Sequence, residues 1–78
     1  MPKEDIACDV SILKNGDIVY YYNIDNGKAI IDQGTVKEDN WYTDGVEVHG
    51  EDWKQYVSKW FICKVERDGK ILFEKEGE

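Results

Sequence analysis

Three dipeptides limit what this chain can fold into: Asn15-Gly16, Asn26-Gly27 and Asp68-Gly69, each between runs rich in Val, Ile, Tyr and Phe. Asn, Asp and Gly adopt positive φ at low cost, so these dipeptides between strand-like runs predict β-hairpins. The second and third are each followed by Lys, a pattern typical of a three-residue loop with a left-handed Gly and a bulge after it. The sequence therefore predicts a mainly β protein built from antiparallel hairpins.

Alternating apolar residues predict five to six strands, at residues 6–14, 17–24, 28–36 and 41–48 and on both sides of the 68–69 turn. Residues 37–40 are polar and predict a loop. Residues 17–24 are apolar or aromatic on both faces, which is typical of a strand that is covered on both sides. The domain core would cover one face, and barrel curvature or a partner would cover the other.

The hydrophobic period changes after residue 50. Trp53, Tyr56, Val57 and Trp60 stand at i, i+3, i+4 and i+7, which predicts a short helix over about residues 51–60, before the last hairpin. Carboxylates in the expected first turn suit the positive end of the helix dipole. With this helix, the predicted fold lies at the border between mainly β and α+β.

The 78 residues predict a single domain, 1–78. The net charge of −7 comes from 17 acidic against 10 basic residues, a balance that disfavours direct binding of nucleic acid and anionic membranes. No apolar signal region or membrane-length run is present, so we expect a cytoplasmic protein. Cys8 and Cys63 fall at apolar-alternating positions and are expected to be buried, reduced thiols, although the sequence leaves a disulfide between them open.

The opening of the chain resembles a known family. The segment Lys14-Asn15-Gly16-Asp17-Ile18-Val19-Tyr20, followed by Gly34-Thr35-Val36, is similar to the start of SH3-like small barrels of the KOW and Tudor type. The resemblance implies a strongly curved five-stranded sheet that serves as a binding module. The helix expected at 51–60 is longer than the single turn usual before the last strand of such barrels. An open sheet with one packed helix is therefore the alternative architecture.

No motif for catalysis or for cofactor binding is present. His49 is the lone histidine and is expected to lie in a loop, because a metal site needs three or four converging ligands. Phosphate-binding loops and the local signatures of hydrolases and metalloproteases do not occur. We therefore expect no enzymatic activity, no catalytic residues, no metal and no cofactor.

Aromatic residues give the main functional hypothesis, a non-enzymatic protein-interaction module. Tyr and Trp are enriched at binding hot spots because they bury a large area with few rotatable bonds. The predicted face suits a basic protein partner and consists of Tyr20, Tyr22, Trp41 and Tyr42, rimmed by Asp39 and Asp44. Two alternatives stay open. The tyrosines could complete the core and cover the sheet edges, or a second copy could cover the face in a homodimer.

An acidic stretch gives the second functional hypothesis. Five carboxylates lie within fourteen residues: Asp39, Asp44, Glu47, Glu51 and Asp52. Such a surface could imitate nucleic-acid phosphates and block a nucleic-acid-binding protein, as phage or mobile-element inhibitors do, in the host cytoplasm if the protein is virus-encoded. Lys54 and Lys59 interrupt the surface, and a solvated charged face is the ordinary meaning of such a run.

Overall fold

The computed structural model describes residues 7–42 and 44–75, except for the side chains of residues 25 and 38–42. It contains one short 3-10 helix and six strands. In chain order these are η1 (Val10–Ile12), β1 (Ile18–Asp25), β2 (Lys28–Tyr42), β3 (Gly45–His49), β4 (Lys54–Ser58), β5 (Ile62–Arg67) and β6 (Lys70–Glu74). The prediction of a mainly β fold of five to six antiparallel strands is confirmed.

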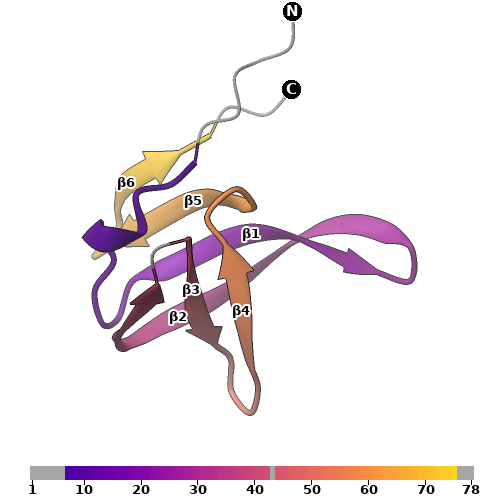
Figure 1. Ribbon diagram of the computed structural model, residues 1–78, viewed down its shortest axis with the longest axis horizontal. Coiled ribbons are helices and arrows are strands. Elements are labelled where there is room, and N and C mark those ends of the chain that lie inside the picture. Colours follow the sequence, from indigo (N-terminus) through magenta and orange to yellow (C-terminus); the bar gives the residue numbers. More distant parts are fainter. Residues whose placement is uncertain (1–6, 43, 76–78) are drawn as a thin grey trace, which may run out of the picture.

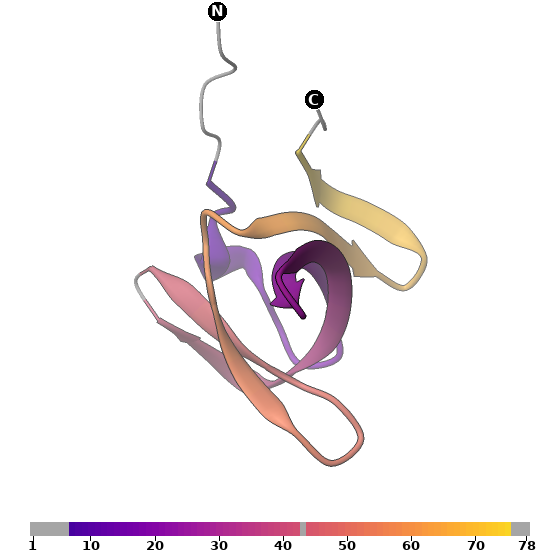
Figure 2. The same cartoon turned by 90° about the vertical axis from the view of Figure 1, so that its right-hand side faces the viewer.

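The strands form a single antiparallel sheet in the order β4-β3-β2-β1-β5-β6. The sheet is open and strongly curved, and β1 lies at its centre between β2 and β5 (Figure 1). Seen from the side, β4 and β3 curl toward the same interior as β1 and β5 (Figure 2). The core fills this interior and consists of Cys8, Val10, Leu13, Val19, Tyr21, Val36, Val46, Val48, Val57, Ile62 and Val65.

The expectation of a first strand over residues 6–14 is wrong for the described part of that segment, which contains η1 instead. Asp9 starts this turn, because its Oδ1 accepts the Ser11 backbone N–H at 3.1 Å and thereby competes with an extended conformation. Cys8, Val10 and Leu13 are buried from this segment and cover one end of the core. β5 occupies the place beside β1 that the first hairpin was expected to fill.

The helix predicted over residues 51–60 is also wrong. Residues 50–53 form the turn of a β3–β4 hairpin, closed by the Gly50 N–H bond to the Trp53 carbonyl at 2.8 Å, and β4 follows. The inward residues of β4 recur every second position, at Gln55 and Val57, while Tyr56 faces solvent. Pairing with β3 places Val57 opposite Val46. This pairing makes the segment a strand, although its apolar residues have helical spacing.

The Asn26-Gly27 and Asp68-Gly69 dipeptides close two hairpins, β1–β2 and β5–β6. Each loop has two residues, because Asp25 pairs with Lys28 and Arg67 pairs with Lys70. Asn26 and Asp68 both have φ of 53°, and the following glycines have φ of 78° and 81°, as type I′ turns require. The predicted three-residue loops are therefore one residue too long. The segment expected as a loop at 37–40 continues β2.

A buried ion pair joins the start of β1 to the end of β5. Asp17 is 1% exposed, and its two carboxylate oxygens each accept a hydrogen bond of 2.8 Å from the Arg67 guanidinium. The same guanidinium donates to the Ile12 carbonyl at 2.7 Å, and the Lys14 backbone N–H donates to Asp17 at 2.8 Å. The only arginine of the chain thus fastens the η1 segment to the sheet.

Candidate functional site

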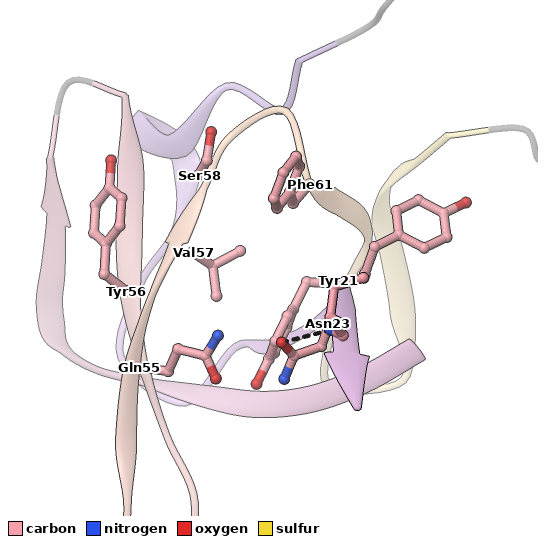
Figure 3. Close-up of a pocket in the computed structure, with 9 residues that line it drawn as sticks. Tyr21, Asn23, Gln55, Tyr56, Val57, Ser58 and Phe61 are labelled. Atoms are coloured by element: carbon pink, nitrogen blue, oxygen red, sulfur yellow. Dashed lines mark hydrogen bonds between the residues drawn. The ribbon is translucent and has the colours of Figure 1, made fainter. Parts of the chain in front are cut away.

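The main cavity of functional interest lies between the end of β1 and the edge strand β4, and we call it the β1–β4 groove. It has a volume of about 340 Å³ and is lined by Tyr21, Tyr22, Asn23, Ile24, Gln55, Tyr56, Val57, Ser58 and Phe61 (Figure 3). The groove exists because β1 leaves β5 early. Their pairing ends at Tyr21 and Ile62, followed by one bond from the Tyr22 N–H to the Phe61 carbonyl at 3.0 Å.

The rim of the groove is apolar and exposed. Tyr22 is 37% exposed, Ile24 68%, Tyr56 48% and Phe61 57%. These side chains come from β1, from β4 and from the turn that precedes β5, so three chain segments converge on one opening. Exposed apolar surface around a concavity is typical of an interaction site.

The inner end of the groove is polar. Tyr21 is fully buried, and its hydroxyl has no hydrogen-bond partner in the described structure. Asn23 and Gln55 extend into the same end of the groove as the Tyr21 ring (Figure 3). Burial, together with the nearby Asp32 carboxylate, raises the pKa of Tyr21, so its hydroxyl stays protonated at neutral pH.

Of the predicted aromatic face, Tyr20 and Tyr22 lie on the same side of β1, and Tyr21 points into the core, as the alternation predicts. Tyr22 lines the groove. Tyr20 is half-buried, and its hydroxyl donates to Glu66 Oε1 at 3.2 Å while Lys64 Nζ lies 5.2 Å from its ring centroid. Tyr20 does not line the β1–β4 groove, but it lines a second cavity of about 330 Å³ together with Tyr22 and Ile31.

Trp41, Tyr42 and Asp39 have side chains outside the described part of the structure. Their backbone belongs to β2, where Trp41 pairs with Val46. Tyr20 pairs with Gln33, eight residues earlier on the same strand, and the pairing of β2 with β3 shifts register between Val36 and Trp41. The register of β2 therefore does not bring Trp41 beside Tyr20 along the sheet.

Asp44, predicted as a rim carboxylate, lies at the start of the β2–β3 return and accepts a 2.7 Å hydrogen bond from the Tyr56 hydroxyl. This bond holds Tyr56 on the face of β4 opposite to Gln55 and Val57, and Figure 3 shows its ring pointing away from them. Sequence reasoning missed Tyr56, Phe61 and Ile24 as site residues, because the helical spacing assigned Tyr56 to a packed stripe. The apolar character of both faces of β1 was the one signal that pointed toward this surface.

The remaining acidic residues lie on β3 and in the β3–β4 turn. Glu47 is 3.4 Å from His49 Nε2 and 3.9 Å from Lys54 Nζ, so the Lys54 ammonium offsets part of its charge. Glu51 and Asp52 are exposed in the turn. Within residues 7–42 and 44–75, His, Cys, Asp and Glu side chains form no group of three or more that could hold a metal ion.

Both cysteines are free and buried, and burial raises the pKa of the Cys8 thiol to about 11. A thiol of that pKa is a poor nucleophile at neutral pH, because the thiolate is the reactive form. No helix in the described part of the chain is long and apolar enough to span a membrane. Comparisons with protein-family models, curated proteins and solved structures gave no match.

Proposed function

We propose that this protein is a small non-enzymatic interaction module that binds a basic protein through the β1–β4 groove. One observation carries the proposal: exposed apolar side chains from three chain segments surround a single cavity of about 340 Å³. Binding a partner there removes apolar surface from water, which is the main favourable term in association. Tyr22, Tyr56 and Phe61 add ring surface that loses little conformational entropy on binding.

The charge of the chain indicates what kind of partner it binds. The chain has a net charge of −7, and Asp44 accepts a hydrogen bond from Tyr56, one of the residues that line the groove. Opposite charge on a partner speeds encounter and fixes orientation more than it adds affinity. The apolar rim then holds the complex, and the acidic surface selects basic partners.

The fold supports a binding-module reading of the family resemblance. In place of the expected helix, a single turn from Ser58 to Phe61 precedes β5, closed by the Phe61 N–H bond to the Ser58 carbonyl at 2.9 Å. A single turn before the last strand is the arrangement of SH3-like barrels. β1–β5 would correspond to the five strands of such a barrel, and β6 is an addition at the edge next to β5.

The proposal is tested with a partner captured by cross-linking and pull-down and then purified. Phe61→Ser removes a rim side chain that is 57% exposed, and Ile71→Ser is the matched control on β6, because Ile71 is 51% exposed and outside the groove. We expect Phe61→Ser to weaken the affinity by about tenfold or more, as at a binding hot spot, and Ile71→Ser to leave it unchanged. Equal effects of the two changes would contradict the proposal.

Imitation of nucleic acid through the acidic surface is the second candidate, favoured by the exposure of Glu51 and Asp52 in the β3–β4 turn. The same purified partner distinguishes it. Glu51→Gln with Asp52→Asn would then abolish binding, and added salt would weaken the affinity steeply as ions screen the charges. Under the groove proposal both effects are small. Self-association that Phe61→Ser abolishes would instead identify a second copy as the occupant.

A further inference from the structure

The Tyr21 hydroxyl is the starting point, because it is buried in the groove without a hydrogen-bond partner in the described structure. A buried hydroxyl that lacks a partner costs free energy, and native proteins rarely leave one without a ligand, an ion or a water. The aromatic ring of Tyr21 is fixed in the core, so the hydroxyl cannot turn away to solvent. It therefore lacks a hydrogen-bond partner that a group entering the groove could supply.

The polar groups beside this hydroxyl are mainly hydrogen-bond donors. Tyr21 stays protonated at neutral pH, because burial and Asp32 raise its pKa. Asn23 Oδ1 already accepts the Ile24 backbone N–H at 2.9 Å, which leaves the Asn23 amide nitrogen to donate. Gln55 lies at the same end and offers both a donor and an acceptor (Figure 3). A group bound here needs an acceptor at its tip and is better bound if it can also donate to Gln55.

The walls of the groove exclude charge. None of the nine lining residues is Asp, Glu, Lys, Arg or His, and apolar side chains such as Ile24, Val57 and Phe61 form much of its surface. Burying a charged group among them without a partner would be costly. The volume of about 340 Å³ is at the lower end of the range for small-ligand sites, which suits one ring.

These requirements select one natural side chain. Phe has no acceptor, Trp has only a donor, Asn, Gln, Ser and Thr lack a large apolar body, His is partly charged near neutral pH, and the ionised side chains are excluded. Tyr has an uncharged ring and a hydroxyl that both accepts and donates. We propose that the β1–β4 groove takes a tyrosine side chain of the partner, with its hydroxyl accepting from Tyr21 and donating to Gln55. This inference rests on the proposed function, because it names the group that the partner inserts.

The test uses p-cresol, which is the tyrosine side chain, and toluene, which is the same ring without the hydroxyl. Each is titrated into the 15N-labelled full chain while backbone amide shifts are recorded. We expect p-cresol to shift amides of residues 22–24, 55–58 and 61, with a dissociation constant in the millimolar range for so small a ligand. Toluene should shift the same amides and bind more than about fivefold more weakly, because it lacks both hydrogen bonds of the hydroxyl, each worth about fivefold.

Tyr21→Phe isolates the hydroxyl. The substitution should weaken the binding of p-cresol about fivefold and leave the binding of toluene unchanged. Tyr20→Phe is the control on the outer face of β1, where the hydroxyl donates to Glu66, and it should change neither titration. The proposal is overturned if p-cresol binds elsewhere or not at all, or if Tyr21→Phe weakens both ligands equally.

Two checks keep the outcome decisive. Tyr21→Phe removes an unpaired hydroxyl, so its melting temperature should not fall, and if the variant nevertheless fails to fold, the p-cresol to toluene ratio on the native chain decides. A ratio near one contradicts the proposal. If p-cresol fails while Phe61→Ser still abolishes partner binding, the tyrosine inference is wrong and the proposed function stands.

Discussion

At the scale of single residues, Asp17 is the residue outside the groove whose contacts we expect to contribute most to stability. It is the one fully buried charged side chain in the described part of the chain, and Arg67 contacts both of its carboxylate oxygens. Removing one partner of such a pair leaves a buried charge without compensation, which typically costs 3–5 kcal/mol. No sequence pattern indicates this pair beyond the presence of a single arginine.

Arg67→Met should therefore destabilise the protein by about 3 kcal/mol, at the lower end of that range because the Arg67 side chain is 34% exposed. Urea unfolding measures the loss. Lys70→Met, an exposed cation three residues away, is the control and should change stability by no more than about 0.5 kcal/mol. Equal losses for the two variants would show that the buried pair contributes nothing specific.

Acid pH should reduce the difference in stability between the native chain and the Arg67→Met variant. Burial alone would raise the pKa of Asp17, but the bonds from Arg67 and from the Lys14 N–H outweigh it and hold the pKa below its ordinary value of 3.8. A lowered folded-state pKa stabilises the protein above the unfolded-state pKa, and this stabilisation is lost as pH falls through the folded-state value. Melting curves below about pH 4 should therefore converge, and a difference that stays constant would contradict the assignment.

At the scale of elements, turn chemistry was predictable and segment 51–60 was not. The Asn26-Gly27 and Asp68-Gly69 hairpins follow from residues that accept positive φ, a local property. The spacing of Trp53, Tyr56, Val57 and Trp60 fits a helix, yet it is equally compatible with a turn, a five-residue strand and a second turn. Pairing with β3 decides between them, and no local pattern encodes that long-range contact.

The same ambiguity explains what the sequence could predict of the site. The alternation of β1 identified Tyr22 as a surface aromatic and Tyr21 as an inward one. Tyr56 and Phe61 join Tyr22 only because β4 folds back toward β1, which depends on the whole sheet. Residues from one strand could be grouped from the sequence, and residues from three segments could not.

Amide hydrogen exchange tests the strand assignment of residues 54–58. β4 is an edge strand, so only the amides that face β3 should be protected, in an alternating pattern. A helix over 51–60 would instead protect consecutive amides after its first turn, because each bonds to a carbonyl four residues earlier. Uniform protection through residues 55–60 would therefore contradict the β3–β4 hairpin.

At the scale of the whole molecule, the open sheet has two exposed edges, β4 and β6, and β4 borders the groove, which is lined by large apolar side chains. The η1 segment closes one end of the core with Cys8, Val10 and Leu13. No other segment of the described chain covers the gap between β1 and β4. The groove is thus a consequence of the early separation of β1 from β5.

The most direct measurement is the footprint of the purified partner on the 15N-labelled chain, read as amide shift changes and cross-saturation. It maps the interface without any substitution that could disturb folding. We expect the largest effects at residues 22–24, 55–58 and 61, around the groove. Effects centred on Glu47, Glu51 and Asp52, with the groove amides unchanged, would contradict the groove as the binding surface.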